Sequence, residues 1–137
     1  MKITYNNYID LNNYKKLLND AGWKILSDKQ HMNAINNSIF ISCCICDDKV
    51  AGMARLVGDG SVHGLLCDVV VLSEYRHMGI GRNLIKNIKD DVYNMLEDNE
   101  QFLIELCPSY GKRNFYLNCG FKYKPENMDG MYLWIKK

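Results

Sequence analysis

The chain has 137 residues, of which 47% are hydrophobic and 24% are charged. This length fits a single core, since single domains usually hold roughly 100–200 residues, and we expect one domain over residues 1–137. The composition favours a packed core over disorder. Seventeen basic and sixteen acidic residues leave a formal charge of +1, which excludes the broad positive surface typical of a nucleic-acid-binding protein.

The first two predicted elements are helices. Apolar residues recur at helical spacing over residues 11–21, after Asp10 as a favourable N-cap and before Gly22 as a stop. Ser27 and Gln30 have the spacing of a capping box, which predicts a second, short helix.

Three strands are predicted to follow. Residues 38–46 and 50–57 are rich in β-forming residues and are separated by a polar break, which predicts a hairpin. The turn at residues 58–61 leads to another β-rich segment over residues 65–72. We therefore expect three successive antiparallel strands.

The second half of the chain changes period. Apolar residues on one face from Leu84 to Leu96 predict a long helix after Gly81. The further predicted elements are a strand at 102–107, a short helix at 109–118 and two closing strands at 121–123 and 131–135. The strand, helix and strand from 65 to 107 imply parallel pairing within a mixed sheet, because a right-handed crossover joins parallel strands.

No leader, membrane segment or metal site is predicted. The N-terminal residues lack the apolar run of a secretory signal, and no stretch approaches the roughly 18 apolar residues of a membrane helix, so we expect a cytoplasmic protein with no membrane partner. The six cysteines mostly lie in apolar runs and are expected in the core. Cys43 and Cys46 have C-x-x-C spacing, but a strand turns them to opposite faces, and no second Cys or His pair accompanies them.

The segment Arg76-His77-Met78-Gly79-Ile80-Gly81 lies between a predicted strand and the long helix. Its glycines allow a tight turn in which backbone N–H groups and the helix N-terminus face a phosphate. Arg76 and Arg82 add local charge. Two glycines can also serve only to connect a strand to a helix, so the surrounding sequence has to decide.

Two common nucleotide motifs do not fit. Leu84 occupies the position of the last glycine in the Rossmann fingerprint. Gly111-Lys112-Arg113 lacks the upstream glycine and the following Ser or Thr of a P-loop. A dinucleotide or nucleoside triphosphate site of either type is therefore disfavoured.

The segment resembles the signature Gln/Arg-x-x-Gly-x-Gly/Ala of the GNAT superfamily of N-acetyltransferases, in its small single-domain bacterial form, through Arg76, Gly79 and Gly81. Residues 68–71 and 114–121 resemble that family's fourth strand and its helix-to-Gly-Phe segment. The resemblance implies an α/β (α+β) fold with a mixed, mostly antiparallel sheet of about six to seven strands and about four helices.

The resemblance also implies acetyl-coenzyme A as cosubstrate. Main-chain amides from Arg76 to Gly81 would hold its diphosphate, and the strand ending at Val71 would offer main-chain groups to the pantetheine arm. The cofactor-binding residues are then Val69, Val70, Val71, Arg76, His77, Met78, Gly79, Ile80, Gly81, Arg82 and Asn114. The thioester would enter a gap between the fourth and fifth strands, and the amine would arrive from the opposite side.

Tyr116 lies four residues before Gly120, where this family commonly has a tyrosine acid. A phenol with a pKa near 10 can serve as the proton donor to a departing thiolate, although Tyr116 can also simply pack its ring. Asp68 is the carboxylate nearest the expected gap and the candidate base, with Glu105 in reserve. Many relatives place the acid one position earlier, at Cys67 here, so Asp68 can instead bind the substrate cation or cap a loop.

The remaining polar candidates have other expected roles. His31, His63 and His77 are expected at the surface or in turns. Cys107 and Cys119 flank the expected site, but no His is positioned to activate them, which favours direct attack by the amine over an acetyl-cysteine.

The resemblance thus implies transfer of acetyl from acetyl-coenzyme A to a primary amine of a small molecule or peptide, within a ternary complex. Residues 22–23 and 54–60 resemble a subgroup of small bacterial acetyltransferases related to plant-type arylalkylamine acetyltransferases, and Trp23 can shape an acceptor pocket or lie in the core. Family members often form homodimers. The alternatives are a non-catalytic acyl-coenzyme A-binding module and an enzyme acting on protein lysines or N-termini.

Overall fold

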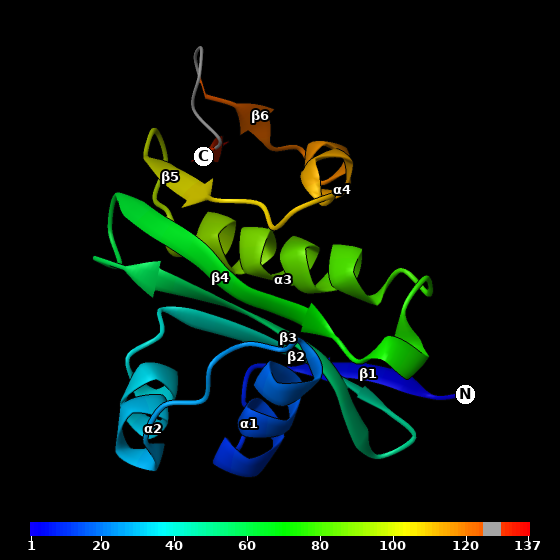
Figure 1. Ribbon diagram of the computed structural model, residues 1–137. Helices are drawn as coiled ribbons and strands as arrows, with labels where there is room; N and C mark the ends of the chain where they lie inside the picture. The colour runs from blue at the N-terminus through cyan, green and yellow to red at the C-terminus, as the bar shows by residue number, and fades with distance from the viewer. Residues whose placement is uncertain (125–129) are drawn as a thin grey trace.

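The computed structural model describes residues 1–124 and 130–137, with a β-sheet between two layers of helices (Figure 1). A 3₁₀ helix at Ser73–Tyr75 follows the fourth strand. In chain order the other elements are β1 (Ile3–Asn6), α1 (Leu11–Asp20), α2 (Asp28–Asn36), β2 (Phe40–Cys46), β3 (Lys49–Gly58), β4 (His63–Val71), α3 (Ile80–Met95), β5 (Gln101–Leu106), α4 (Arg113–Asn118), β6 (Lys122–Tyr123) and β7 (Met131–Lys136).

The sheet has seven strands in the order β1-β2-β3-β4-β5-β7-β6. Every neighbouring pair is antiparallel except β4 and β5, which are parallel and are joined by the crossover helix α3. The predicted fold class, a mixed and mostly antiparallel sheet with four helices, is confirmed.

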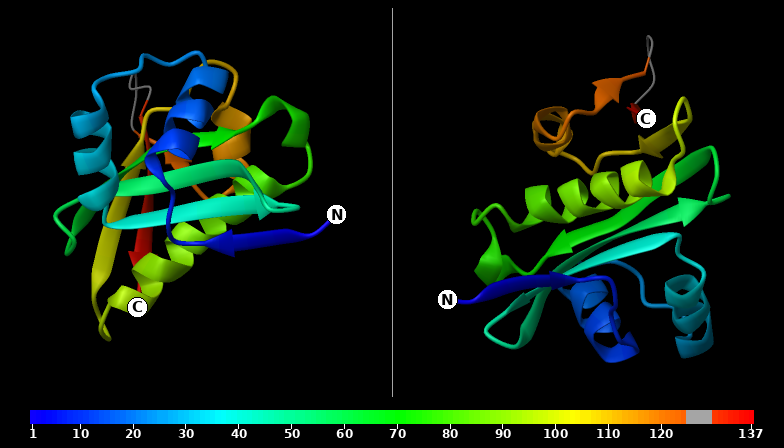
Figure 2. Two further views of the ribbon diagram at one scale, coloured as in Figure 1. Left: turned by 90° about the horizontal axis from the view of Figure 1, so that it is seen from below. Right: turned by 180° about the vertical axis from the view of Figure 1, so that it is seen from behind.

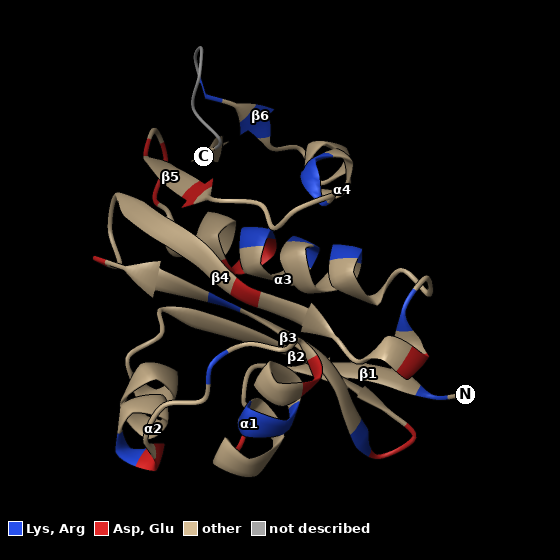
Figure 3. Cartoon of the chain, in the orientation of Figure 1, with Lys and Arg blue, Asp and Glu red and all other residues tan. Residues whose placement is uncertain are grey.

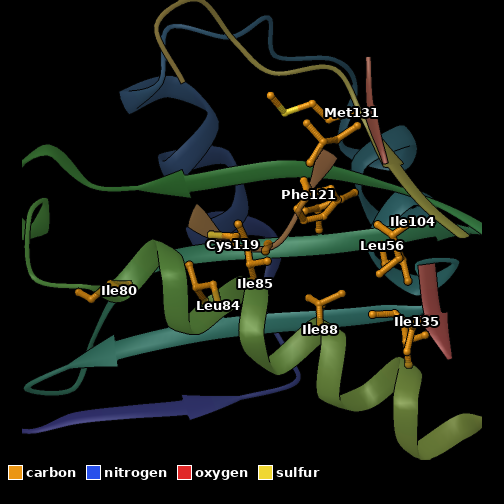
Figure 4. Close-up of a cluster of buried hydrophobic side chains, with 14 of the residues drawn as sticks. Leu56, Ile80, Leu84, Ile85, Ile88, Ile104, Cys119, Phe121, Met131 and Ile135 are labelled. Atoms are coloured by element: carbon orange, nitrogen blue, oxygen red, sulfur yellow. The ribbon is translucent and has the colours of Figure 1, made fainter. Parts of the chain in front are cut away.

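The helices divide between the two faces of the sheet. α1 and α2 lie on one face and α3 lies on the other (Figures 1 and 2). The charged residues of α2 and α3 lie on the sides turned away from the sheet (Figure 3). The buried residues of α3 recur at helical spacing, and Figure 4 shows those labelled directed toward strand residues such as Leu56 and Ile104. The buried residues of α3 are Ile80, Leu84, Ile85, Ile88 and Val92.

On the other face, the caps of α1 and α2 are those predicted from the sequence. The Asp10 carboxylate accepts a hydrogen bond from the Asn13 N–H at 2.9 Å. Ser27 and Gln30 form a reciprocal capping box at the start of α2. These side chains satisfy N–H groups that have no partner within a helix, so both helix starts are set by local sequence.

Several features differ from the sequence predictions. β1 was not predicted, because its four residues are mostly exposed and form a strand only by pairing with β2. α4 begins at Arg113, later than expected. His31 is only 5% exposed, because its ring packs on Tyr14 and its Nε2 accepts a hydrogen bond from a backbone N–H. Cys107 is exposed rather than in the core.

The predicted separation of Cys43 and Cys46 is confirmed, since each belongs to the core on a different face of the sheet. Within residues 1–124 and 130–137, no group of three or more His, Cys, Asp or Glu side chains is arranged to hold a metal ion. In the same residues, no helix has both the length and the apolar character required to cross a membrane.

Leu84→Ala should lower the free energy of unfolding by about 2–5 kcal/mol, because the Leu84 side chain is fully buried between α3 and the sheet and its truncation leaves a cavity there. Leu26→Ala is the matched control, since Leu26 is 46% exposed and surface changes usually cost less than about 0.5 kcal/mol. Urea denaturation measures both. Equal midpoints for the two variants would contradict this account of the core.

Candidate active site

The candidate site lies where β4 and β5 part. The two strands pair only from His63–Leu103 to Leu65–Glu105, and β4 then continues to Val71 without pairing to β5. A cleft of about 800 Å³ adjoins this part of β4, a size typical of small-molecule sites. Its lining residues are Ala21, Trp23, Val69, Val70, Val71, Tyr75, Arg76, His77, Gly79, Ile80, Gly81, Arg82, Ser109, Gly111, Lys112, Phe115, Tyr116, Asn118 and Cys119.

The glycine-containing turn presents main-chain donors to this cleft. Gly79 is the N-cap of α3 with a φ of 79°, in the left-handed region that glycine adopts readily, and no side chain caps the helix. The N–H groups of Ile80, Gly81 and Arg82 are in the first helical turn, which leaves them without partners inside the helix. None of them donates to another group in the described part of the chain. Together they form a cradle suited to an anion.

At Gly81 the same turn has little room for a side chain. A Cβ built on Gly81 would lie 3.1 Å from Cζ of Phe115 on α4. That approach is tighter than ordinary van der Waals contact, so a side chain at this position would displace the Phe115 ring. The glycine thus lets α3 lie close to α4 beside the cleft.

The charge of the lining suits a phosphate. It includes Arg76, Arg82 and Lys112 and no Asp or Glu. Arg76 has a structural role as well, because its Nε donates to the Val71 carbonyl at 3.1 Å and its guanidinium approaches Asp20 at 3.7 Å. Arg82 and Lys112 make no side-chain hydrogen bond or ion pair within the described residues, which leaves both cations available to a ligand.

Most of the cofactor-binding residues predicted from the sequence come together here. The β4 segment 69–71 and the turn from Arg76 to Arg82 line one cleft. Met78 and Asn114 are not in the lining. The Met78 side chain is exposed, and Asn114 is an exposed residue in the first turn of α4.

Tyr116 lines the same cleft from α4. Its ring makes edge-on contacts with Phe115 and Phe121, at centroid distances of 5.0 and 6.0 Å. Burial raises the pKa of Tyr116 to about 12, with a smaller contribution from Cys119. The phenol is therefore protonated at neutral pH, and its hydroxyl has no hydrogen-bond partner among the residues described.

Asp68, the predicted base, is not part of the lining. Its Oδ2 accepts hydrogen bonds from Arg55 Nε at 2.5 Å and from the Tyr14 hydroxyl at 2.6 Å. Burial and the adjacent carboxylate raise the pKa of Tyr14, so the phenol remains a donor. One oxygen of this carboxylate is thus already engaged by a cation and a hydroxyl. The geometry therefore gives no support to a base role for Asp68.

The reserve candidate Glu105 is also engaged. Its carboxylate oxygens contact His63 Nε2 and form an ion pair with Lys124 Nζ, and it does not line the cleft. Burial raises the pKa of Cys67 to about 11, so this side chain remains a thiol and does not replace a carboxylate base. Neither β4 nor β5 thus offers a free carboxylate near the point where the two strands separate.

The two residues that hold Asp68, Tyr14 and Arg55, were not predicted from the sequence. Tyr14 was predicted only as an apolar position of the first helix, and Arg55 only as part of the family-like segment at residues 54–60. Nothing in their local sequence connects either one with Asp68, which lies 54 positions beyond Tyr14. Trp23, by contrast, was a candidate pocket residue, and it does line the cleft.

Comparison with known proteins agrees with the family resemblance of the sequence. The family model for the acetyltransferase (GNAT) domain matches residues 37–123, more than half of the chain. The uncharacterized N-acetyltransferase ycf52 of Gracilaria tenuistipitata var. liui is 26% identical over 134 residues, covering 95% of this chain and 71% of that protein.

Two solved structures show a similar fold. A probable acetyltransferase of meticillin-resistant Staphylococcus aureus has a TM-score of 0.80 at 21% identity, covering 93% of this chain and 95% of the other. The ribosomal-protein-S18-alanine N-acetyltransferase of Escherichia coli has a TM-score of 0.77 at 18% identity, covering 99% and 96%. Taken with the family model, the site and the fold lead to one conclusion: this chain belongs to the GNAT family of acetyltransferases.

Proposed function

We propose that this protein transfers the acetyl group of acetyl-coenzyme A to a primary amine of a small molecule or peptide, by direct attack within a ternary complex. The observation that carries the proposal is that one cleft joins the anion cradle at residues 79–82, the unpaired edge of β4 and the hydroxyl-bearing side chain of Tyr116. The cradle would hold the diphosphate, the unpaired edge of β4 would bind the pantetheine arm, and Tyr116 would lie beside the thioester.

The residues present fit the proposed cosubstrate. The cradle and the free cations Arg82 and Lys112 suit the diphosphate, because the lining carries no opposing carboxylate. Beyond Leu65, main-chain groups on the open edge of β4 lack a strand partner, and amide groups of an extended pantetheine arm can pair with them as a neighbouring strand would.

Tyr116 is the proposed proton donor. The unprotonated amine nitrogen attacks the thioester carbonyl carbon and gives up a proton to water as the amide forms. The carbon–sulfur bond breaks, the sulfur takes a proton from the Tyr116 hydroxyl, and the phenolate regains a proton from water. A pKa of about 12 makes Tyr116 a weak acid. The same burial acts on the departing thiolate, however, since desolvation raises the pKa of any group that is negative when deprotonated. Burial therefore shifts the pKa of the acid and that of the thiol in the same direction.

The amine must lose a proton before or during attack, because a protonated amine has no free electron pair. Asp68 and Glu105 are both held in ion pairs. We therefore assign this proton to water rather than to a side-chain base.

The proposal is tested by measuring thiol release from acetyl-coenzyme A with a panel of amines and short peptides, alongside a calorimetric titration with the cosubstrate. Turnover on a small amine or peptide supports it. Tight binding without turnover on any acceptor favours a non-catalytic acyl-coenzyme A-binding module. Turnover only with intact proteins, located by mass spectrometry, favours a protein acetyltransferase, and absence of binding by the folded protein refutes all three.

Tyr116→Phe should lower turnover at least tenfold, since acid–base groups typically contribute roughly 10²–10⁴ to the rate. Affinity for acetyl-coenzyme A should change little, because the ring remains in place. Tyr8→Phe, at an exposed tyrosine outside the cleft lining, is the control. An undiminished rate for Tyr116→Phe would remove this residue from the mechanism.

Gly79→Asp should weaken the binding of coenzyme A by about tenfold or more, because a carboxylate at the helix N-cap would face the diphosphate. Gly79→Asn is a closely matched control, since Asn has the same shape, tolerates the left-handed backbone and carries no charge. Both side chains meet the same left-handed backbone, so the comparison isolates the effect of the charge. Isothermal titration calorimetry decides, and equal affinities would contradict the placement of the diphosphate.

The pH profile should show no base with a pKa near neutrality. We expect kcat/KM to rise roughly tenfold per pH unit between about pH 6 and pH 9, following the deprotonation of the acceptor amine. Because the pKa of Tyr116 is raised to about 12, its acid form persists, and ionisation of this phenol should cause no fall in this range. A plateau near pH 7 would instead reveal a side-chain base.

A further inference from the structure

The strand β4 contains a bulge next to the cleft. Between two paired positions β3 has one residue where β4 has two, Asp68 and Val69. The backbone of Asp68 has a φ of 51°, in the left-handed region that most residues with a Cβ disfavour and that Asp and Asn tolerate better. Such a conformation persists only where the surroundings hold it.

The surroundings of Asp68 form an anchor. One carboxylate oxygen accepts hydrogen bonds from Arg55 Nε at 2.5 Å and from the Tyr14 hydroxyl at 2.6 Å. Arg55 in turn donates to Ser38 Oγ at 3.3 Å, and its guanidinium lies 5.9 Å from the centroid of the Tyr14 ring. Tyr14 is nearly fully buried in α1. The bulge is therefore tied to β3, to α1 and to the residues that follow α2.

The anchored residue immediately precedes the part of β4 that lines the cleft, residues 69–71. A bulge redirects the residues that follow it, and a slip of one residue in strand register turns every following side chain to the other face. Holding Asp68 in the left-handed conformation thus determines which groups of Val69, Val70 and Val71 face the cleft.

The same anchor is linked to the connection between α1 and α2. The Tyr14 ring packs against His31 at a centroid distance of 5.3 Å, and His31 Nε2 accepts a hydrogen bond from the Leu26 N–H at 2.9 Å. Leu26 belongs to this connection, which also contains the cleft-lining residue Trp23. Tyr14 therefore contacts both the anchor at Asp68 and a residue that holds this connection.

We propose that Asp68 is a positioning residue, whose contacts with Arg55 and Tyr14 hold the β4 bulge in the conformation that binds the pantetheine arm. This proposal rests on the proposed function, because it assigns a role at the same site. It gives the carboxylate a conformational task in place of proton transfer.

Four variants separate the possible roles. Asp68→Ala removes the anchor and the tolerance of the left-handed backbone, whereas Asp68→Gly removes only the anchor. Asp68→Asn keeps the backbone tolerance and an oxygen acceptor but loses the charge. Tyr14→Phe removes one hydrogen bond and keeps the ring. Asp28→Ala, which breaks an exposed ion pair with Lys15, is the control.

We expect Asp68→Ala to raise KM and Kd for acetyl-coenzyme A by about tenfold to a hundredfold, as displacement of positioning groups does, with kcat at saturation reduced less. Asp68→Gly and Tyr14→Phe should raise KM by smaller factors. Asp68→Asn should keep KM close to the wild-type value. The Asp28→Ala control should match the wild type.

A general base would behave differently. Loss of kcat by roughly 10²–10⁴ in Asp68→Asn, with Kd unchanged, would overturn the proposal. A lowered melting temperature in Asp68→Ala with unchanged Kd and KM would overturn it as well, because the anchor would then serve stability alone.

Hydrogen exchange in the absence of ligand tests the anchor independently of any activity. The amides of residues 66–71 should exchange faster in Asp68→Ala than in the wild type, while those of α3 remain protected. Unchanged exchange at these residues would refute the anchor. Failure of the wild type to bind acetyl-coenzyme A would refute the proposed function instead, so the two failures are distinguishable.

Discussion

The site depends on the loss of hydrogen bonding between two adjacent parallel strands. β4 and β5 stop pairing after Leu65 and Glu105, yet each continues its ladder with its other neighbour. β3 holds β4 as far as Val71, and β7 holds β5 as far as Leu106. Because unpaired backbone groups buried away from water are costly, the parted edge has to face solvent or a ligand, and the cleft lies along it.

The position of the anion cradle follows from this geometry. α3 starts shortly after β4 ends, so its first N–H groups point toward the same opening, and Gly79 and Gly81 keep that approach free of side chains. The chain carries almost no net charge, and the three cations of the lining are local. The diphosphate binding that we propose would thus arise from oriented main-chain dipoles supplemented by a few side chains, rather than from a general positive surface.

The two carboxylates near the point where β4 and β5 separate are engaged in contacts within the fold. Asp68 balances Arg55 beneath the bulge, and Glu105 balances Lys124 beside β7. In a partly buried setting each cation would be left uncompensated without its carboxylate. The proposed chemistry therefore depends on one buried phenol and on water, and the acidic residues shape the walls in which that phenol acts.

The sequence by itself determined the helices, most strands, the cradle and the family resemblance, because periodicity, caps and glycine spacing act within a few residues. Only the tertiary structure decided the environments of β1, His31 and Asp68. Strand β1 needs β2 as its partner, and Asp68 meets Tyr14 across 54 positions of the chain. A side chain's protonation and orientation depend on what packs against it, and residues so distant in sequence come together only when the whole sheet has formed.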